Sequence, residues 1–380
     1  MKMNIAVIMQ SPDLGGAEKF MITLMSRFRR AGCNTVVASN RGKFFEQVSK
    51  ERFKTIALPF ILDIIGNKRG LFKSILLLPF AIVFYSHLLW NLRKQKTDLI
   101  LMSGFSEKLL ITFLTVFFRI PVFWIEYGAL KTIFIRNFYI PWILYQSLLG
   151  IPKKIIVPSD FTKNDLKKNL RIAESKILLV PCGIEIRLDK KIKIPEKLEK
   201  KLIIGSVSRL TYEKGQDYLI KAVPLVLEKI PNAYFIIVGD GPDRIRYRSL
   251  INELGIHKNV RMTGFVTDTA NYYPLFDLFI FPSVWELEGF GLVVVEAMIN
   301  KIPVIGTDNG PIPEIIEDGT SGLIVPARDE KALARAIIRL GQDASLRSKM
   351  GKAGYEKAIE KYSIVDVSKK YLDTFNEAAK

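Results

Sequence analysis

Two glutamates, Glu288 and Glu296, lie eight positions apart in a segment that reads Glu-Gly-Phe-Gly-Leu-Val-Val-Val-Glu. The apolar run 275–282 before them predicts a buried strand, and residues 292–300 predict a helix. A loop between a strand and a helix presents free backbone N–H groups and the positive end of the helix dipole to an anion. A carboxylate beside such an anion site needs another task, and we expect Glu288 to bind sugar hydroxyls.

Two cations in the same half of the chain follow another predicted strand, residues 202–207. Arg209 comes at its end, and Lys214 follows after a short loop. Both side chains can reach a diphosphate and neutralise the negative charge that develops on it as a leaving group. The alternative is a pair of solvated surface cations, but the nearby glutamate segment favours the anion site.

A glycine pair, Gly15 and Gly16, follows the first predicted strand of the chain, residues 5–9. Glycine lets a backbone approach a ligand closely, and the helix predicted at residues 17–31 offers its N-terminus there. Contact of Gly16 with a phosphate and a plain tight turn both remain open on this evidence.

Short apolar runs that alternate with helical segments must position these residues. In the first half, strands are predicted at residues 5–9, 35–38, 98–102, 122–126, 155–158 and 180–183. In the second half, strands are predicted at 202–207, 234–238, 260–263, 278–282 and 304–306, and helices at 216–229, 332–341 and 344–362. This alternation predicts the α/β class, with two doubly wound, Rossmann-like parallel-sheet domains whose carboxyl edges face each other across a cleft.

The proposed domain boundaries follow from composition. Residues 181–183 and the charged stretch 187–201 predict an exit from the first domain and a linker. We therefore assign 1–186 to an N-terminal, acceptor-binding domain and 187–362 to a C-terminal, nucleotide-sugar-binding domain. We expect 363–380 to form a helix that returns to the first domain.

The bulk composition narrows the class of protein. A chain of 380 residues is long enough for two domains with their own cores. Its two cysteines, Cys33 and Cys182, are far apart in sequence, which argues for a reducing compartment rather than a disulfide framework. The apolar run at residues 5–9 is too short for a signal peptide and reads as a strand.

The charge is concentrated in the first half of the chain. Residues 1–190 hold 29 Lys and Arg against 13 Asp and Glu, a net charge of +16, whereas the remainder carries +2. The same half contains long apolar stretches at 71–92, 109–125 and 132–149. A basic and apolar half fits an anionic membrane surface. A buried core with solvated lysines remains the alternative. Interrupting polar residues disfavour a spanning helix, and no nucleic-acid motif is present.

Four segments together resemble the family 4 retaining glycosyltransferases, which have the two-domain GT-B fold. The matching segments span nearly the whole chain, and they are Gly15 to Glu18, Ser208 to Gly215, Gly239 to Pro242, and Pro282 to Ala297. The second and the last are highly specific in this order, and the glycine loop is less so.

The resemblance implies a donor site for a UDP- or GDP-sugar, held mostly by the C-terminal domain. Glu288, Arg209 and Lys214 would be the catalytic residues, with the two cations on the diphosphate and Glu288 on the transferred sugar. Glu296 would hold the ribose hydroxyls. The remaining donor contacts would come from Gly16, Val266 (against the base), Phe290, Gly291 and Leu292.

The reaction that the resemblance implies is transfer of a hexose with retention at the anomeric carbon. Fixed cations and N–H dipoles can meet the charge on the leaving phosphate, so we expect no cofactor and no required metal. Many members of the family have a histidine after a strand of the first domain, where this chain has Tyr127. Any sugar or acceptor contact from this strand therefore falls to Glu126 or Tyr127, and a helix-cap role for Glu126 is nearly as plausible. The two histidines, His87 and His257, read as structural.

We therefore predict a glycosyltransferase that acts on a glycan or lipid-linked acceptor in surface polysaccharide or glycolipid synthesis. It would be cytoplasmic, and peripheral at the inner face of the membrane. A GT-B-fold epimerase or hydrolase of sugar nucleotides is the alternative. A dinucleotide-dependent oxidoreductase is disfavoured because no G-x-G-x-x-G follows a first strand. The intact cations and glutamates argue against a catalytically silent scaffold.

Overall fold

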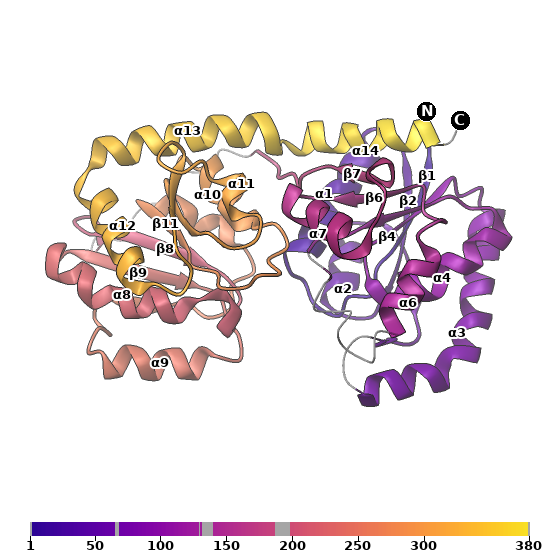
Figure 1. The fold of residues 1–380 in the computed structure, drawn as a ribbon, viewed down its shortest axis with the longest axis horizontal. Helices are drawn as coiled ribbons and strands as arrows, with labels where there is room; N and C mark the ends of the chain where they lie inside the picture. Colours follow the sequence, from indigo (N-terminus) through magenta and orange to yellow (C-terminus); the bar gives the residue numbers. More distant parts are fainter. Residues whose placement is uncertain (1, 65–67, 129, 131–139, 187–197, 379–380) are drawn as a thin grey trace. The chain divides into compact units, whose positions relative to one another are not determined.

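The computed structural model describes residues 2–64, 68–128, 130, 140–186 and 198–378 (Figure 1). The chain divides into two compact units, each described here by itself. Unit 1 comprises Met1–Gly183 and Ile364–Lys380, and unit 2 comprises Ile184–Ser363. The sequence placed the corresponding boundaries after residues 186 and 362. Most of the predicted linker, 187–197, lies outside the described residues.

Unit 1 is built on a parallel sheet, with the order β3-β2-β1-β4-β5-β6-β7 among the described residues. Its strands are β1 (Asn4–Ile8), β2 (Asn34–Asn40), β3 (Lys54–Leu58), β4 (Leu99–Met102), β5 (Val122–Ile125), β6 (Lys154–Val157) and β7 (Ile177–Leu179). Its helices are α1 (Gly16–Arg30), α2 (Lys43–Lys50), α3 (Lys68–Lys94), α4 (Phe105–Phe118), α6 (Ile140–Leu148), α7 (Asp160–Leu170), the 3-10 helix η2 (Glu174–Lys176) and α14 (Ile364–Ala378).

Unit 2 holds a second parallel sheet, with the order β10-β9-β8-β11-β12-β13 in the part that the structure describes. Its strands are β8 (Leu202–Val207), β9 (Ala233–Val238), β10 (Val260–Met262), β11 (Leu278–Phe281), β12 (Val304–Thr307) and β13 (Gly322–Val325). Its α-helices are α8 (Gln216–Lys229), α9 (Arg244–Glu253), α10 (Leu292–Ile299), α11 (Ile312–Ile315), α12 (Glu330–Gln342) and α13 (Ala344–Tyr362). Its 3-10 helices are η4 (Tyr212–Lys214), η5 (Thr269–Asn271) and η6 (Tyr273–Leu275).

Local chemistry explains these elements. The central strands are continuous runs of buried apolar residues, as expected where both faces of a parallel sheet are covered. Side chains cap several helices: the Asp329 carboxylate accepts from the Ala332 N–H at the start of α12, and the Asp343 carboxylate accepts from the Leu346 N–H at the start of α13. The two-domain α/β architecture predicted from the sequence is therefore confirmed.

The strand predictions need three corrections. The run 180–183 is not a strand, because β7 ends at Leu179. Val180 still donates to the Val157 carbonyl at 2.9 Å, but Pro181 has no N–H with which to extend the ladder. In addition, β3 and β13 were not predicted; β3 lies at the edge of its sheet and is only partly buried, so its apolar signal is weak.

The order of strands reverses between β1 and β4 in unit 1 and between β8 and β11 in unit 2. In doubly wound sheets, ligands bind beyond the carboxyl ends of the strands at this switch point. The loops after β8 and β11 are those that carry Arg209, Lys214 and Glu288, so the topology of unit 2 brings the predicted residues to one edge.

The C-terminal helix α14 belongs to unit 1, where it packs on α1. Its Phe375 is fully buried, and the centroid of its ring lies 5.9 Å from that of Phe28 and 4.7 Å from that of Phe123. A segment at the end of the sequence thus completes the core around residues from its first third.

Candidate active site

The loop after β8 is held in place by the loop after β9. The Leu210 N–H donates to the Asp240 carbonyl at 2.9 Å, and the Asp243 N–H donates to the Leu210 carbonyl at 3.1 Å. Gly239 has φ +135°, and a Cβ there would lie 1.9 Å from the Ser208 carbonyl oxygen, so only glycine allows this close approach. These contacts fix the backbone on both sides of Arg209.

The turn that carries Lys214 lies directly over the end of β11. Lys214 ends η4, and Gly215 follows with φ +68° before α8 begins. A Cβ on Gly215 would lie 1.8 Å from the Pro282 carbonyl oxygen. The Val284 N–H also donates to the Glu213 carbonyl at 2.9 Å. The backbone of the two loops is therefore in contact, and Lys214 is carried to the glutamate segment.

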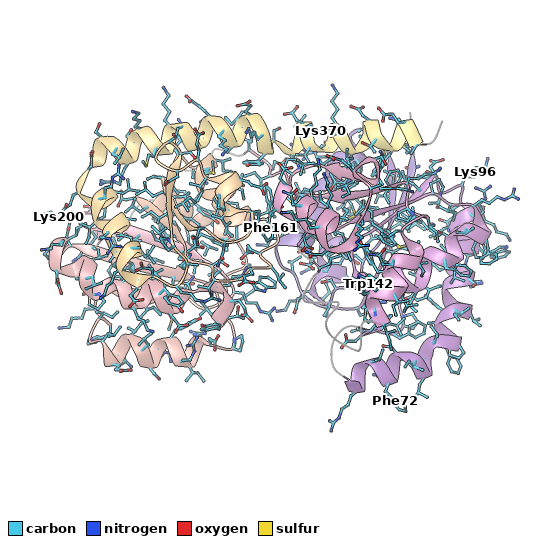
Figure 2. All side chains as sticks on the ribbon, in the orientation of Figure 1. Phe72, Lys96, Trp142, Phe161, Lys200 and Lys370 are labelled. Carbon is cyan, nitrogen blue, oxygen red and sulfur yellow. The ribbon has the colours of Figure 1, made fainter. Side chains whose placement is uncertain are left out.

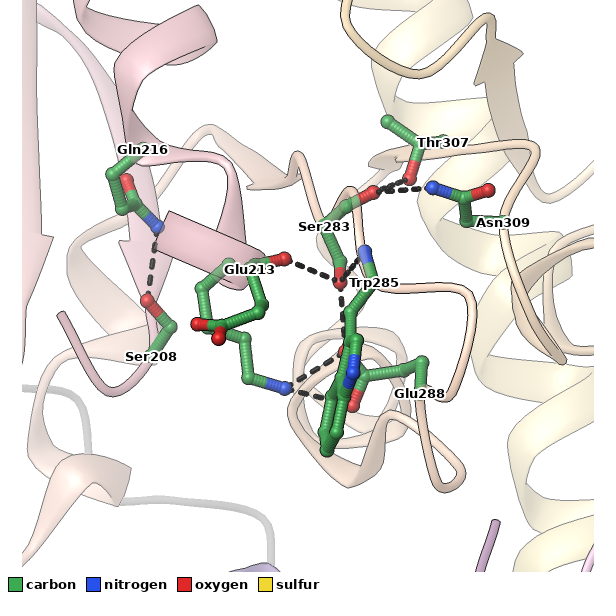
Figure 3. Close-up of polar contacts among 9 residues, drawn as sticks. Ser208, Glu213, Gln216, Ser283, Trp285, Glu288, Thr307 and Asn309 are labelled. Carbon is green, nitrogen blue, oxygen red and sulfur yellow. Dashed lines mark hydrogen bonds and ion pairs between the residues drawn. The ribbon is translucent and has the colours of Figure 1, made fainter. Parts of the chain in front are cut away.

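Lys214 and Glu288 form a buried ion pair (Figure 3). The lysine Nζ lies 2.8 Å from both carboxylate oxygens of Glu288, and the Ser283 hydroxyl donates to Oε2 at 2.8 Å. The side chains of Lys214 and Glu288 are 19% and 7% exposed. The pair neutralises a carboxylate that is shielded from water, and Ser283 fixes the orientation of that carboxylate.

Residues around Ser283 hold the loop after β11 in shape. The Thr307 hydroxyl donates to the Ser283 carbonyl at 2.5 Å, and the Asn309 side-chain amide donates to the same carbonyl at 3.4 Å (Figure 3). The Trp285 side chain is exposed, and its ring centroid lies 5.2 Å from the Lys214 Nζ. Sequence reasoning did not assign these residues, and only the polar Pro-Ser end of the strand could have indicated Ser283.

The second glutamate lies on α10, one turn into the helix. Glu296 accepts a hydrogen bond of 2.5 Å from the hydroxyl of Tyr273, a fully buried residue of η6. Gly291 and Leu292 lie at the N-terminus of α10, where free N–H groups and the helix dipole favour an anion. The Phe290 ring is buried against Tyr362 with centroids 5.6 Å apart, so Phe290 can offer a ligand its backbone rather than its ring.

Arg209 and Val266 complete the predicted donor residues of unit 2. The Arg209 side chain is exposed, and within the described residues it has no ion pair or hydrogen bond. Val266 is half-buried in the loop after β10, next to Gly264, whose backbone bridges to Gly239. The loop of Val266 therefore lies beside the loop that holds Arg209. The assigned ligand contacts of these residues stay predictions.

In unit 1, the glycine pair begins a helix. Gly15 is the cap of α1, and Gly16 is its first residue. The Glu18 carboxylate accepts from the Gly15 N–H at 2.8 Å and from the Ser11 hydroxyl at 2.8 Å, so a side chain satisfies one of the free N–H groups at this helix start. The contact of Gly16 with a diphosphate stays a prediction.

Glu126 and Tyr127 follow β5, and both carry buried polar atoms. Glu126 is 4% exposed and accepts from the Lys108 Nζ at 2.7 Å and the Tyr145 hydroxyl at 2.9 Å. The Tyr127 hydroxyl is buried, no described residue bonds to it, and burial raises the pKa of Tyr127 well above its usual value. Glu126 therefore has an evident structural task, and an acceptor contact from either residue stays a prediction.

A second buried carboxylate in unit 1 was missed. Glu107, near the start of α4, accepts from the Gln10 N–H just beyond β1, and the Gln10 side-chain amide donates to the Tyr85 hydroxyl at 2.9 Å. Burial raises the pKa of Glu107 to about 7. Glu107 and Lys108 stand in an otherwise apolar run, and that contrast was the available signal.

Among the described residues, no group of three or more His, Cys, Asp or Glu is arranged to hold a metal ion. Both cysteines are buried and free. The expectation that no metal is required stays a prediction.

Comparison with known proteins agrees with this geometry. Residues 14–188 match the glycosyltransferase family 4 description, and residues 188–357 match glycosyl transferases group 1. Alpha-D-kanosaminyltransferase of Streptomyces kanamyceticus is 32% identical over 44% of this chain, and the alignment spans only 43% of that protein. The capsular polysaccharide biosynthesis glycosyltransferase CapM of Staphylococcus aureus is 25% identical over 88% of this chain and 87% of its own.

The fold has clear counterparts among solved structures. HepE of Anabaena, solved in complex with UDP, superposes with a TM-score of 0.82 at 20% identity, over 99% of this chain and 100% of that one. This likeness confirms the predicted GT-B fold. Together with the two matched families, which adjoin at residue 188, it shows that the chain belongs to the group 1 glycosyltransferases of family 4.

Proposed function

We propose that this chain transfers a hexose from a UDP- or GDP-sugar to a glycan or lipid-linked acceptor, with retention at the anomeric carbon. The observation that carries the proposal is the Lys214–Glu288 ion pair at the switch point of unit 2, next to the loop of Arg209. A cation, a carboxylate and a helix N-terminus at one sheet edge provide both a diphosphate site and a sugar site. UDP in HepE and the polysaccharide synthesis named for CapM support the donor and acceptor classes.

In this mechanism, Arg209 binds the donor diphosphate, because its guanidinium is exposed beside the carboxyl end of β8. Lys214 and the N–H groups at Gly291 and Leu292 add fixed positive charge to the leaving phosphate. Glu288, held by Ser283, accepts hydrogen bonds from hydroxyls of the sugar, and Glu296 accepts from the ribose.

The glycosyl–phosphate bond breaks through an oxocarbenium-like state while negative charge grows on the phosphate. The acceptor oxygen attacks from the same face, and the departing phosphate takes its proton, which gives retention. These fixed charges do the work that a metal would otherwise do, so turnover should persist in a chelator.

The acceptor is proposed to lie at the inner face of a membrane, as a lipid-linked glycan for surface polysaccharide or glycolipid. The excess of positive charge in residues 1–190 and the exposed apolar helices of unit 1 support this location. The polysaccharide synthesis named for CapM supports the same class of product.

Two measurements test the proposal. Calorimetric titration with UDP and with GDP identifies the base, and Arg209→Ala should weaken the affinity by about 1.5–3 kcal/mol, the usual worth of a hydrogen bond to a charged group. Glu288→Gln should abolish most transfer into membrane lipid while the circular dichroism spectrum is unchanged. Unaltered affinity or unaltered turnover would overturn the assignments. Breakdown or isomerisation of the donor without acceptor would point instead to a hydrolase or an epimerase.

A further inference from the structure

The largest group of exposed apolar side chains in unit 1 lies along α3. Phe72, Ile75, Leu76, Phe80, Val83 and Trp90 succeed one another at helical spacing and form a stripe open to solvent. Phe80 is 68% exposed and Val83 is 70% exposed. Such a run of exposed large apolar residues marks an interaction surface rather than scattered chance exposure.

Two neighbouring helices add to this surface. α4 packs against α3 and against α6, and Figure 1 shows the three helices together on one side of unit 1. α4 exposes Phe113, Val116 and Phe117, and α6 exposes Trp142, Ile143 and Leu144. Figure 2 shows the sticks of Phe72 and Trp142 on this part of unit 1. We call the exposed residues of α3, α4 and α6 the apolar face.

The charges on these helices are of one sign. The sequences of α3 and α6 contain no Asp or Glu, and the acidic residue of α4, Glu107, is buried. Exposed cations flank the apolar residues: Arg69 and Lys73 near the start of α3, and Arg93 and Lys94 at its end. Beyond that end, Asp98 is engaged by the Asn4 N–H at 2.7 Å. A fringe of cations around an apolar stripe complements anionic lipid headgroups over acyl chains.

The opposite side of α3 shows how the helix meets a bilayer. By length and composition, Arg69–Lys94 is the one helix in the described part of the chain that could cross a membrane. Its other stripe, however, is buried in the core of unit 1 through Ala81, Tyr85, Leu88 and Leu92. A helix committed to a protein core on one side cannot be surrounded by lipid, and Pro79 interrupts its backbone hydrogen bonds.

We propose that the apolar face docks unit 1 on a leaflet of anionic phospholipid, with α3 lying in the plane of the interface and its stripe among the acyl chains. The inference rests on the proposed function for the acceptor, which this docking would bring within reach as a membrane-bound substrate. Trp90 and Trp142 then lie at headgroup depth, where tryptophan side chains are enriched.

The first test is flotation of the full chain with vesicles of phosphatidylcholine, with and without phosphatidylglycerol. Binding is expected only with the anionic lipid, and salt should weaken it. Phe80→Ser should lower the partition coefficient by roughly tenfold, since one apolar side chain no longer enters the bilayer. Arg69→Gln with Lys73→Gln should lower it by roughly 25-fold, at about fivefold per cation near the surface.

Unit 2 provides matched controls. Ile245 on α9 is 80% exposed, and Arg335 on α12 is exposed. Ile245→Ser and Arg335→Gln should float like the native chain. Equal losses in the control and test variants, or flotation on neutral vesicles alone, would overturn the assignment of the surface.

Tryptophan quenching gives a second, local readout. With brominated lipid in the vesicles, a Trp285→Phe chain keeps Trp90 and Trp142 and should be quenched. A chain with Trp90→Phe and Trp142→Phe keeps Trp285 and should not be. Trp124 is fully buried and common to both. Absence of quenching in the first chain would refute the docking.

Neither assay depends on sugar transfer, so failure of docking is separate from failure of the proposed function. A chain that transfers sugar to a soluble acceptor but does not float refutes the docking alone. A chain that floats but does not turn over refutes the transferase. Sedimentation that shows a dimer, broken by Phe80→Ser, would instead assign the apolar face to a second copy of this chain.

Discussion

The ion pair between Lys214 and Glu288 allows a quantitative test of the site in the absence of substrate. Lys214→Met keeps most of the length of the side chain but removes its charge. The Glu288 carboxylate, 7% exposed, would then retain the Ser283 hydroxyl at 2.8 Å as its remaining printed-distance donor in the described structure. A shielded carboxylate that loses its cation is costly, and we expect unit 2 to lose about 3 kcal/mol of unfolding free energy.

The two members of the pair should not be equivalent. Lys214 is 19% exposed and so keeps more of its hydration when its partner is removed. Glu288→Gln should therefore cost less, roughly 1–2 kcal/mol. In the double variant neither charge remains, so its loss should be about 2 kcal/mol smaller than the sum of the two single losses.

The assay is hydrogen exchange of the folded chain across a urea series, read by mass spectrometry on peptides of unit 2. Lys331→Met, which removes an exposed lysine of α12, is the matched control and should be neutral. Strictly additive losses in the double variant would show that the two side chains do not interact in solution, and the proposed electrostatics of the site would then fail.

Three further predictions concern the packing. Gly215→Ala should destabilise unit 2 by about 3 kcal/mol or more, since its Cβ would lie 1.8 Å from the Pro282 carbonyl oxygen; near-native urea midpoints would contradict this. The pKa of Glu107 is raised from 4.5 to about 7, so unit 1 should lose stability as the pH rises from about 4.5 through 7. Glu107→Gln should flatten the fall of the thermal midpoint in that window, and parallel curves would refute it. Lys108→Met should cost about 3 kcal/mol by leaving the buried Glu126 without its cation, and calorimetric unfolding measures that loss.

Periodicity and composition were enough to predict the fold. The boundaries of α8 and α13 agree with the predicted ranges, because each helix starts and ends at clear signals such as Gly215 and the Asp343 cap. Edge strand β3 was missed since half-exposed edges carry little apolar signal. The strand expected at 180–183 failed because the chain there turns from the sheet toward α14, and Gly183 packs against Ile364.

The candidate site was predicted in its residues but not in its contacts. The spacing of Glu288 and Glu296 and the position of Lys214 after β8 placed each side chain on the right loop. That Lys214 would pair with Glu288, with Ser283 as a further donor, depends on the packing of two loops 70 residues apart in sequence. Long-range pairing of this kind leaves no local pattern, and the same holds for Lys108 and Glu126.

The return of α14 to unit 1 sets an order for synthesis on the ribosome. Unit 2 is one continuous stretch of chain, and it can fold as soon as it has emerged. Unit 1 begins earlier but lacks Phe375 until the last segment is translated, so Phe28 and Phe123 wait uncovered through the making of nearly 200 intervening residues. The half that is made first is thus finished last, and in that interval the nascent chain is most exposed to aggregation and most in need of chaperones.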